Sequence, residues 1–384
     1  MSTTRRLAVA LGLAVALGAA TATATAADER ATPGERATRV AVPPRSLTVI
    51  AGGDVLTESR VRAAAAVAGQ RTGERFDFGP MFEPVGEVLR RADLAICNME
   101  IPVGRPGQSF GFAGRSPFGG NRLLAPYEVA SGLRRAGFDR CSTASNHGFD
   151  LGVDGIAWTI RGLNEQGITT VGTARTAAES TDDVFEVDGV KVAHLAFTIY
   201  SNTVPPSDPW RLNLVRSPQV MAQRAASTRA RGAEIVVVSI HVSVELGASP
   251  TAADRALVTQ LTALADVDAV FVHGPHVVQP FEIVNGTPVW WSLGNFVSEM
   301  GPPSVGRYAD PRTADGLLAF ADFRERADGG FEAVTRSIAI CNDLRDRTVR
   351  VPAVSLRSPD LPPRVRDELW ACRQRTRVVV PDAR

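Results

Sequence analysis

The chain of 384 residues is long enough to bury one large hydrophobic core. Its 44% hydrophobic and 22% charged residues are typical of a soluble globular protein and exclude a disordered or fibrous one. The formal net charge of +1 excludes a general basic surface for nucleic acid or anionic lipid, so an anionic substrate must be held locally, by a metal ion or by arginine.

Residues 1–26 are predicted to be a signal peptide. Arg5 and Arg6 precede an apolar run over residues 7–20, and residues 24–26 offer an Ala-x-Ala cleavage site. This run is shorter than the roughly 20 residues that a membrane span needs. We therefore expect a secreted or cell-surface bacterial protein with a Sec-type leader, and a Tat signal or an uncleaved anchor are the alternatives. Residues 27–45 are charged and contain proline, which predicts a disordered linker.

After the linker, segments typical of strands and helices alternate. Expected strands cover residues 47–53, 94–98, 140–144, 235–240 and 269–272, and expected helices cover 81–91, 127–136, 155–166, 218–231 and 252–264. Asp188-Gly189 and Asn285-Gly286 predict hairpin turns. This order predicts an α/β fold, an αββα sandwich of mixed sheets flanked by helices, over residues 46–325. Residues 326–384 are predicted to be a β-rich extension with a terminal helix, packed on the same domain.

The four cysteines could form disulfides in an exported protein. Cys97 and Cys141 lie within two expected core strands, and we interpret them as buried free thiols. A bridge between Cys341 and Cys372 is as consistent with the sequence as two further thiols.

Residues that can bind metal stand where the expected strands end. They are Asp54, Glu100, His147, His241, His273 and His276. Ligands of α/β sheets collect where loops leave the carboxyl ends of the strands, so these side chains are expected to share one site. Imidazoles, carboxylates and the amide oxygen of Asn146, which precedes His147, are ligands of a borderline or hard divalent ion. The pattern predicts a metal site with one or two ions.

Six motifs carry these residues in chain order. They are Gly53-Asp54, Asn98-Met99-Glu100, Asn146-His147 with Asp150, His241 with Glu245, His273-Gly274-Pro275-His276, and Ser292-Leu293-Gly294-Asn295-Phe296. In this order they resemble the motifs of the capsule-synthesis CapA family, the poly-γ-glutamate biosynthesis proteins that share the calcineurin-like metallophosphoesterase fold. The resemblance extends over roughly residues 47–323.

The resemblance implies a CapA-like metallophosphoesterase domain at residues 46–325 and a role for each motif residue. Asp54, Glu100, Asn146, His241, His273 and His276 would bind one or two divalent ions, of Mn, Fe or Zn. His147 would be a general acid whose ring Asp150 orients. Glu245, Asn295 and Arg115 are weaker candidates for substrate contact. Loops 103–122, 201–213 and 299–315 are long enough to line a cleft.

For function, the resemblance implies an exported protein of capsule, poly-γ-glutamate or related polymer biosynthesis. It would be a metal-dependent hydrolase or transferase whose substrate is an anionic polymer or a phosphoester, with no role for nucleic acid. The alternatives are a general secreted metallophosphoesterase or nucleotidase, and a non-catalytic partner of a membrane polymer synthase. The Asn146-His147 pair favours catalysis. Val242, Ser243 and Gly274, where the family has Trp, Gly and His, favour the non-catalytic partner.

Overall fold

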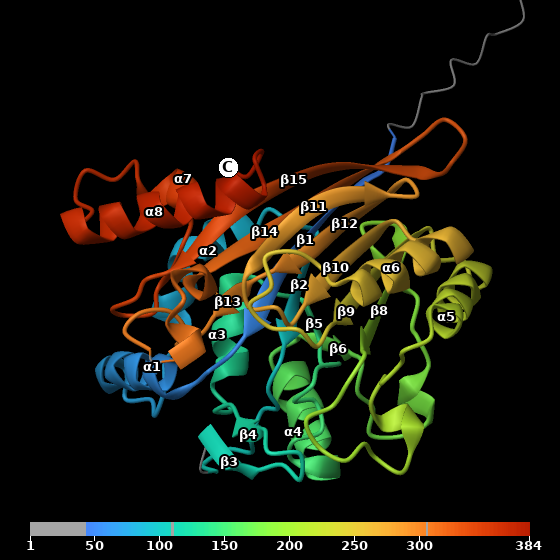
Figure 1. Cartoon of the computed structure of the whole chain (residues 1–384). Helices are drawn as coiled ribbons and strands as arrows, with labels where there is room; N and C mark the ends of the chain where they lie inside the picture. The colour runs from blue at the N-terminus through green and yellow to red at the C-terminus, as the bar shows by residue number, and fades with distance from the viewer. Residues whose placement is uncertain (1–43, 109–110, 305) are drawn as a thin grey trace, which may run out of the picture. The chain divides into compact units, whose positions relative to one another are not determined.

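Two β-sheets packed face to face form the centre of the protein (Figure 1). The computed structural model describes residues 44–108, 111–304 and 306–384, and residues 44–384 form one compact unit. The predicted signal peptide and nearly all of the predicted linker lie outside the described residues. Arg45, at the end of that linker, is bound through its guanidinium to Glu234 and Glu325, each at 2.7 Å.

The first sheet has the strand order β16-β15-β14-β1-β2-β5-β6, and β13 pairs with β1. Strand β1 is parallel to β2 and antiparallel to β14, so the sheet is mixed. Its strands are β1 (Ser46–Val55), β2 (Leu94–Met99), β5 (Arg140–Ser142), β6 (Thr169–Val171), β13 (Asn295–Val297), β14 (Asp315–Glu325), β15 (Phe331–Asn342) and β16 (Val349–Arg350).

The second sheet has the strand order β11-β12-β10-β9-β8-β7. Its strands are β7 (Phe185–Val187), β8 (Val190–Thr198), β9 (Ile235–His241), β10 (Ala269–His273), β11 (Val278–Val284) and β12 (Thr287–Leu293). A separate hairpin pairs β3 (Gly111–Arg115) with β4 (Asn121–Leu124).

Helices cover the outer faces of both sheets. The α-helices are α1 (Ser59–Thr72), α2 (Gly79–Leu89), α3 (Val129–Ala136), α4 (Gly152–Glu165), α5 (Pro218–Ala230), α6 (Ala252–Leu264), α7 (Pro352–Ser355) and α8 (Pro363–Val379). The 3₁₀-helices are η1 (Ala178–Ser180), η2 (Pro209–Arg211), η3 (Gly306–Ala309) and η4 (Pro311–Ala314). Among the described residues, none of the helices is long and apolar enough to span a membrane.

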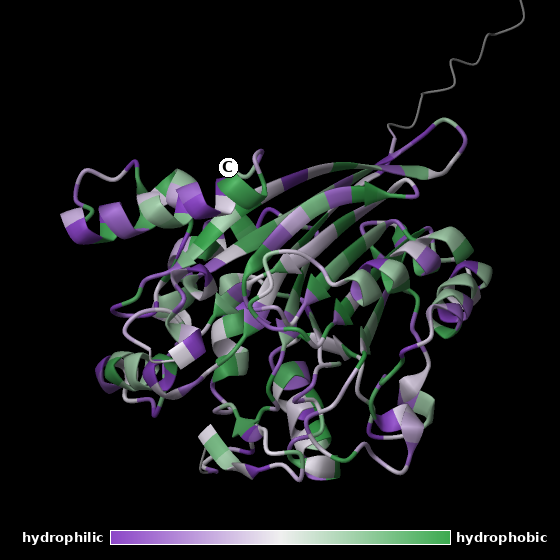
Figure 2. Cartoon of the chain, viewed as in Figure 1, coloured by the Kyte–Doolittle hydropathy of each residue, from purple (hydrophilic) through white to green (hydrophobic). Residues whose placement is uncertain are grey.

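Three apolar layers hold this arrangement together, and they follow from the alternation of side chains along each strand. Trp290 of β12 packs between the two sheets, whereas Trp291 packs on the outer face with Met221 of α5 and Leu261 of α6. On the other side, Phe82 of α2 and Leu133 of α3 cover the first sheet. Figure 2 shows the central strands mostly in hydrophobic colour, whereas α5 and α6 alternate between the two colours. The predicted αββα sandwich is confirmed.

The sequence interpretation missed helix α1 and the β3–β4 hairpin. The buried face of α1 is formed by Val61, Ala65 and Gly69, which are spaced by four residues. Alanine and glycine mark a helical period weakly, because they are also common on exposed surfaces. The terminal helix predicted within residues 326–384 is α8, which packs on β14 and β15.

The interpretation of Cys97 and Cys141 as free thiols was wrong. The parallel register of β2 and β5 places the two residues opposite each other with 4.5 Å between their Cα atoms, and they form a disulfide. The second disulfide joins Cys341 of β15 to Cys372 of α8. The first of these bonds joins the two strands that lead to Glu100 and Asn146.

Gly53 is required because the backbone of β1 closely approaches Gly294, the residue before β13. A Cβ atom at Gly53 would overlap the carbonyl oxygen of Gly294, which accepts a hydrogen bond of 3.0 Å from the backbone N–H of Asp54. Gly53→Ala is therefore expected to lower the free energy of unfolding by about 1–3 kcal/mol, the usual cost of overpacking. Urea denaturation tests this, with Gly247→Ala as control, since its Cβ would have no neighbour closer than 3.4 Å. Equal stability of the two variants would contradict the prediction.

Candidate metal centre

The carboxyl ends of four parallel strands, two from each sheet, bring the candidate ligands together. Asp54 ends β1 and lies in register with Asn98 of the neighbouring β2. His241 ends β9 and lies in register with His273, which ends β10. These side chains are buried, so the site lies inside the protein, at the carboxyl ends of the parallel strands.

Asp54 contacts four of the neighbouring residues. Its Oδ1 accepts a hydrogen bond of 2.8 Å from the Asn98 amide and lies 3.5 Å from Nδ1 of His273. Its Oδ2 accepts a bond of 3.2 Å from the backbone N–H of Gly274 and lies 3.3 Å from Nδ1 of His276. Burial alone would raise the pKa of Asp54, but the two imidazoles hold that pKa below its usual value. The carboxylate is therefore ionised and fixed in position.

Glu100 and His276 complete a group of three with Asp54. Their ligand atoms lie within 4.8 Å of one another, and Nε2 of His276 is 3.7 Å from Oε1 of Glu100. Burial raises the pKa of Glu100 well above its usual value. Burial disfavours the protonated form of His276, but the Glu100 and Asp54 carboxylates outweigh it and raise the pKa of His276 to about 10. The two buried carboxylates thus favour a positive charge beside them, which the protonated His276 supplies; as a ligand of a metal ion His276 would have to be neutral.

The residues present fit a divalent metal ion, as their unused ligand atoms show. Several buried ligand atoms have no hydrogen-bond partner among the described residues: Oε1 and Oε2 of Glu100, Oδ1 of Asn98, Oδ1 of Asn146, Nε2 of His241 and Nε2 of His273. A buried polar atom without a partner costs about 1–3 kcal/mol, so a group of them is unstable unless something binds it. Burial also lowers the pKa of His241 to about 3, which keeps its imidazole neutral, as a metal ligand must be.

His276 is oriented from behind by Asn295. The backbone of His276 is left-handed, with φ of 58°, and this turns the ring from the loop after β10 towards Glu100. The Asn295 carbonyl oxygen lies 3.0 Å from Nδ1 of His276, and its amide donates to the backbone oxygen of Thr313 at 2.9 Å. Asn295 is fully buried behind His276 and is not among the described residues that line the cleft, so a role in orienting His276 fits its position better than the predicted substrate contact.

Gly274 explains one departure from the family motif. Its φ is +101°, and a Cβ atom there would overlap the carbonyl oxygen of Val242. A histidine does not fit this backbone. At this position the contact with Asp54 is made by the backbone, because the N–H of Gly274 donates to the Asp54 carboxylate.

His147 and Asp150 form a pair beside the ligands. Nδ1 of His147 lies 2.6 Å from Oδ2 of Asp150, and because a carboxylate accepts, the imidazole donates. The same oxygen accepts a bond of 2.7 Å from the backbone N–H of Leu123, which fixes the carboxylate. Nε2 of His147 is 3.2 Å from the side-chain amide of Asn202 and faces the cleft. The ring is therefore held with its second nitrogen towards any bound substrate.

A cleft of about 720 Å³ opens above these groups. All three loops predicted to line a cleft contribute to it, through Arg115, Asn202 and Tyr308. On one wall, Oε2 of Glu245 is 2.6 Å from the Arg307 guanidinium and accepts a bond of 2.7 Å from the Tyr308 hydroxyl. The cleft is large enough for a drug-sized ligand or a short polymer segment.

The structure thus brings some predicted residues together and separates others. Asp54, Glu100 and His276 form the compact group, with His273 beside Asp54. Glu245 and Arg115 lie on the cleft wall and could contact substrate, whereas Asn295 lies behind the ligands. These placements leave the role of each residue a prediction.

Sequence reasoning missed Asn202 and Glu58, and it named Asn98 in a motif without giving it a role. Asn98 lies two residues before Glu100, at the end of β2, and it is in register with Asp54, whose carboxylate it contacts. Glu58 lines the cleft, and burial raises its pKa to about 7. Asn202 lies in a loop and has no pattern that marks it.

Comparison with known proteins places the chain in a family. The model of the bacterial capsule synthesis protein PGA_cap matches residues 48–300. The chain is similar to the PGA biosynthesis protein CapA of Bacillus subtilis (28% identity over 264 residues, 66% of this chain and 63% of the relative). It is also similar to the capsule biosynthesis protein CapA of Bacillus anthracis (27% over 263 residues, 66% and 60%).

A further relative in Mycobacterium tuberculosis bears the name "probable polyglutamine synthesis accessory protein" (24% identity over 235 residues, 56% of this chain and 60% of the relative). Among solved structures, the calcineurin-like phosphoesterase YfkN from Bacillus subtilis superposes with a TM-score of 0.40 and 15% identity, covering 87% of this chain and 98% of that one. The chain thus spans less than two thirds of the length of its curated relatives. From the match over residues 48–300, the chain belongs to the family of the bacterial capsule synthesis protein PGA_cap.

Proposed function

We propose that the protein is a divalent-metal-dependent hydrolase or transferase that acts in the biosynthesis of poly-γ-glutamate or a related capsule polymer. One observation carries the proposal: buried ligand atoms without partners meet the His147–Asp150 pair at the floor of one cleft. The names of the relatives support the polymer, since they are capsule and PGA biosynthesis proteins.

The ion or ions would be held by Asp54, Glu100, Asn146, His241, His273 and His276. A divalent ion supplies Lewis acidity when bound, which polarises the bond under attack and makes water more acidic. Mn, Fe and Zn are all compatible with this mixed set of oxygen and nitrogen ligands. Asn98 would keep Asp54 in place through its amide N–H.

His147 would donate a proton to the leaving group. Asp150 accepts from Nδ1–H, so the proton available for transfer is on Nε2, the atom that faces the cleft. The Asn202 amide nitrogen, which only donates, lies 3.2 Å from the same atom, so it would hydrogen-bond to Nε2 once the proton has left it. Removal of a positioned acid of this kind typically slows turnover by about 10²–10⁴-fold.

A second candidate is a non-catalytic partner of a membrane polymer synthase. It is favoured by Val242, Ser243 and Gly274, which replace residues of the family motif, and by the accessory role in the name of the Mycobacterium relative. In that case the buried ligand set would stabilise the fold and Nε2 of His147 would have no substrate.

Incubation of the purified chain with poly-γ-glutamate and with a phosphodiester probe distinguishes the candidates. We expect shortening or modification of the polymer, measured by size-exclusion chromatography, that EDTA abolishes and a divalent metal restores. His147→Ala, which should retain metal, is the control for contaminating hydrolases. Turnover of the phosphodiester alone would favour a general phosphoesterase. Stoichiometric metal with no turnover of either substrate would favour the non-catalytic partner.

A further inference from the structure

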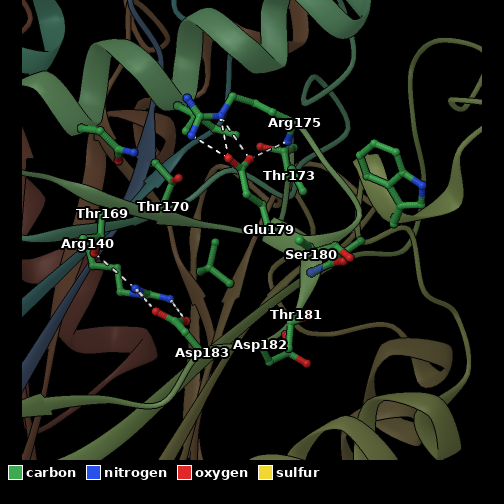
Figure 3. A pocket seen from close by; sticks show the side chains of 18 of the residues that line it. Arg140, Thr169, Thr170, Thr173, Arg175, Glu179, Ser180, Thr181, Asp182 and Asp183 are labelled. Atoms are coloured by element: carbon green, nitrogen blue, oxygen red, sulfur yellow. Dashed lines mark hydrogen bonds and ion pairs between the residues drawn. The ribbon is translucent and has the colours of Figure 1, made fainter.

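A second pocket lies along the open edge of the first sheet, beside β6 (Figure 3). Its volume is about 450 Å³, within the range of small-molecule sites. Strand β6 forms its floor, and the segment that follows β6, including η1, forms its wall. None of the described residues that line it also lines the metal cleft, so the pocket is a separate site.

The edge strand offers backbone groups to this pocket. The N–H of Thr169 donates to the carbonyl oxygen of Asp139 at 2.9 Å, and the carbonyl oxygen of Val171 accepts from Thr143 at 2.8 Å. Both bonds point towards β5. Alternate residues of a parallel strand bond to opposite sides, so the N–H and C=O of Thr170 point away from β5. Thr170 lines the pocket, which therefore has a backbone donor and a backbone acceptor at its floor.

Neutral hydrogen-bonding side chains surround these groups. They are Asn164, Thr169, Thr170, Thr173, Ser180 and Thr181. A hydroxyl both donates and accepts, so a rim of hydroxyls suits a ligand whose own groups do the same.

The charged groups of the pocket are already paired. Arg140 binds Asp183 through two contacts of 2.5 and 3.1 Å, and Arg175 binds Glu179 at 2.6 and 3.0 Å. Figure 3 shows the two pairs at separate sides of the pocket. Arg140 has only 2% of its side chain exposed, so a charged ligand would have to break a pair in a low-dielectric environment. The pocket therefore disfavours ionic ligands.

The Asp183 carboxylate still has lone pairs for a neutral donor. Each of its oxygens accepts one hydrogen bond from Arg140, and its side chain is 50% exposed. A carboxylate held by arginine is a strong and fixed acceptor for a hydroxyl group. Glu179 differs, because each of its oxygens already accepts two hydrogen bonds from Arg175.

Trp210 gives the pocket a flat apolar surface. Its ring is half-buried and lines the pocket, and the Arg211 guanidinium lies 4.3 Å from the ring centroid. This contact fixes the orientation of the indole. A pyranose ring combines an apolar C–H face, which stacks on an indole, with a rim of hydroxyls that donate and accept.

We propose that this pocket binds a neutral hexose unit, with the sugar face on Trp210 and its hydroxyls on Thr170 and Asp183. The hexose is either a free monosaccharide or the terminal residue of a glycan chain. The site is independent of the metal centre and of the catalytic proposal.

Ligand-observed NMR and calorimetry of the full chain test the proposal. The probes are D-glucose and N-acetyl-D-glucosamine as monosaccharides, cellobiose as a glycan end, and L-glutamate and D-glucuronate as charged comparators. We expect saturable binding of a neutral sugar that Trp210→Ala weakens at least tenfold, which is about 1.4 kcal/mol. Thr170→Val, which removes a hydroxyl at constant shape, should weaken it severalfold. Tighter binding of cellobiose than of glucose would identify a glycan end, and the reverse a free sugar.

Trp158→Ala is the matched control, because Trp158 is also half-buried and stacked by an arginine, Arg161, at 4.9 Å, but lies outside this pocket. It should bind sugar like the wild type, and so should His276→Ala. Absence of saturable binding for every neutral sugar would overturn the proposal, as would preference for L-glutamate or D-glucuronate. Binding that survives Trp210→Ala unchanged would also overturn it.

Discussion

His276→Ala is expected to empty the metal centre while the protein remains folded. His276 lies between Asp54 and Glu100: its Nε2 is 3.7 Å from Glu100, and its Nδ1 is 3.3 Å from Asp54 and 3.0 Å from the Asn295 carbonyl oxygen. Removal of the imidazole leaves the two buried carboxylates without the nitrogen that lies beside both of them. Elemental analysis of the purified variant should find metal far below the wild-type stoichiometry. Since a bound ion stabilises the folded state, EDTA should lower the melting temperature of the wild type but not of the variant.

Two further variants separate loss of a ligand from loss of structure. Asn295→Ala keeps His276 but removes its orienting partner, so we expect metal affinity to fall by about 10–100-fold without emptying the site. His194 is the matched control: it is fully buried in β8 and its Nε2 lies 2.9 Å from the Ser239 hydroxyl, outside the ligand group. His194→Ala should lower stability by about 1–3 kcal/mol yet retain metal. Metal loss in His194→Ala equal to that in His276→Ala would show that the first result reflects unfolding.

The sequence was sufficient to predict the two packed sheets and the end of the strands at which the candidate ligands lie. Continuous apolar runs marked β1, β2, β9 and β10, because these strands are buried on both faces. A polar residue directly after such a run must lie at the carboxyl edge, and this made Asp54 and His273 recognisable in advance.

The remaining features depend on contacts between segments far apart in the chain. The disulfide between Cys97 and Cys141 depends on the register of two parallel strands, which no local pattern reveals. The orienting role of Asn295 depends on the pairing of β13 with β1, which brings it behind His276. Asn202 reaches His147 across 55 residues of sequence. Tertiary packing decided these positions, and the local sequence was compatible with several outcomes.

His147→Ala is expected to abolish most of the turnover without removing metal. The imidazole is held by Asp150 at one nitrogen and presents the other to the cleft, so it can transfer a proton but does not belong to the Asp54–Glu100–His276 group. Loss of a positioned general acid should lower kcat by about 10²–10⁴-fold, which is roughly 3–5 kcal/mol of barrier. Asp150→Asn removes the acceptor that fixes the ring and should give a smaller loss. Neither variant should change the metal content.

The leaving group distinguishes an acid from a merely structural histidine. A p-nitrophenyl ester departs as a stable anion and needs little protonation, whereas an alkyl ester of the same acid needs a proton at the departing oxygen. His147→Ala should therefore be impaired far more with the alkyl ester, and the ratio of the two defects measures the acid role directly. Asn146→Ala should lose activity and metal together, because the buried Oδ1 of Asn146 has no hydrogen-bond partner and is proposed to bind the ion. If His147→Ala loses metal as fully as Asn146→Ala, or slows both esters equally, then His147 holds the site together and the proton comes from another group.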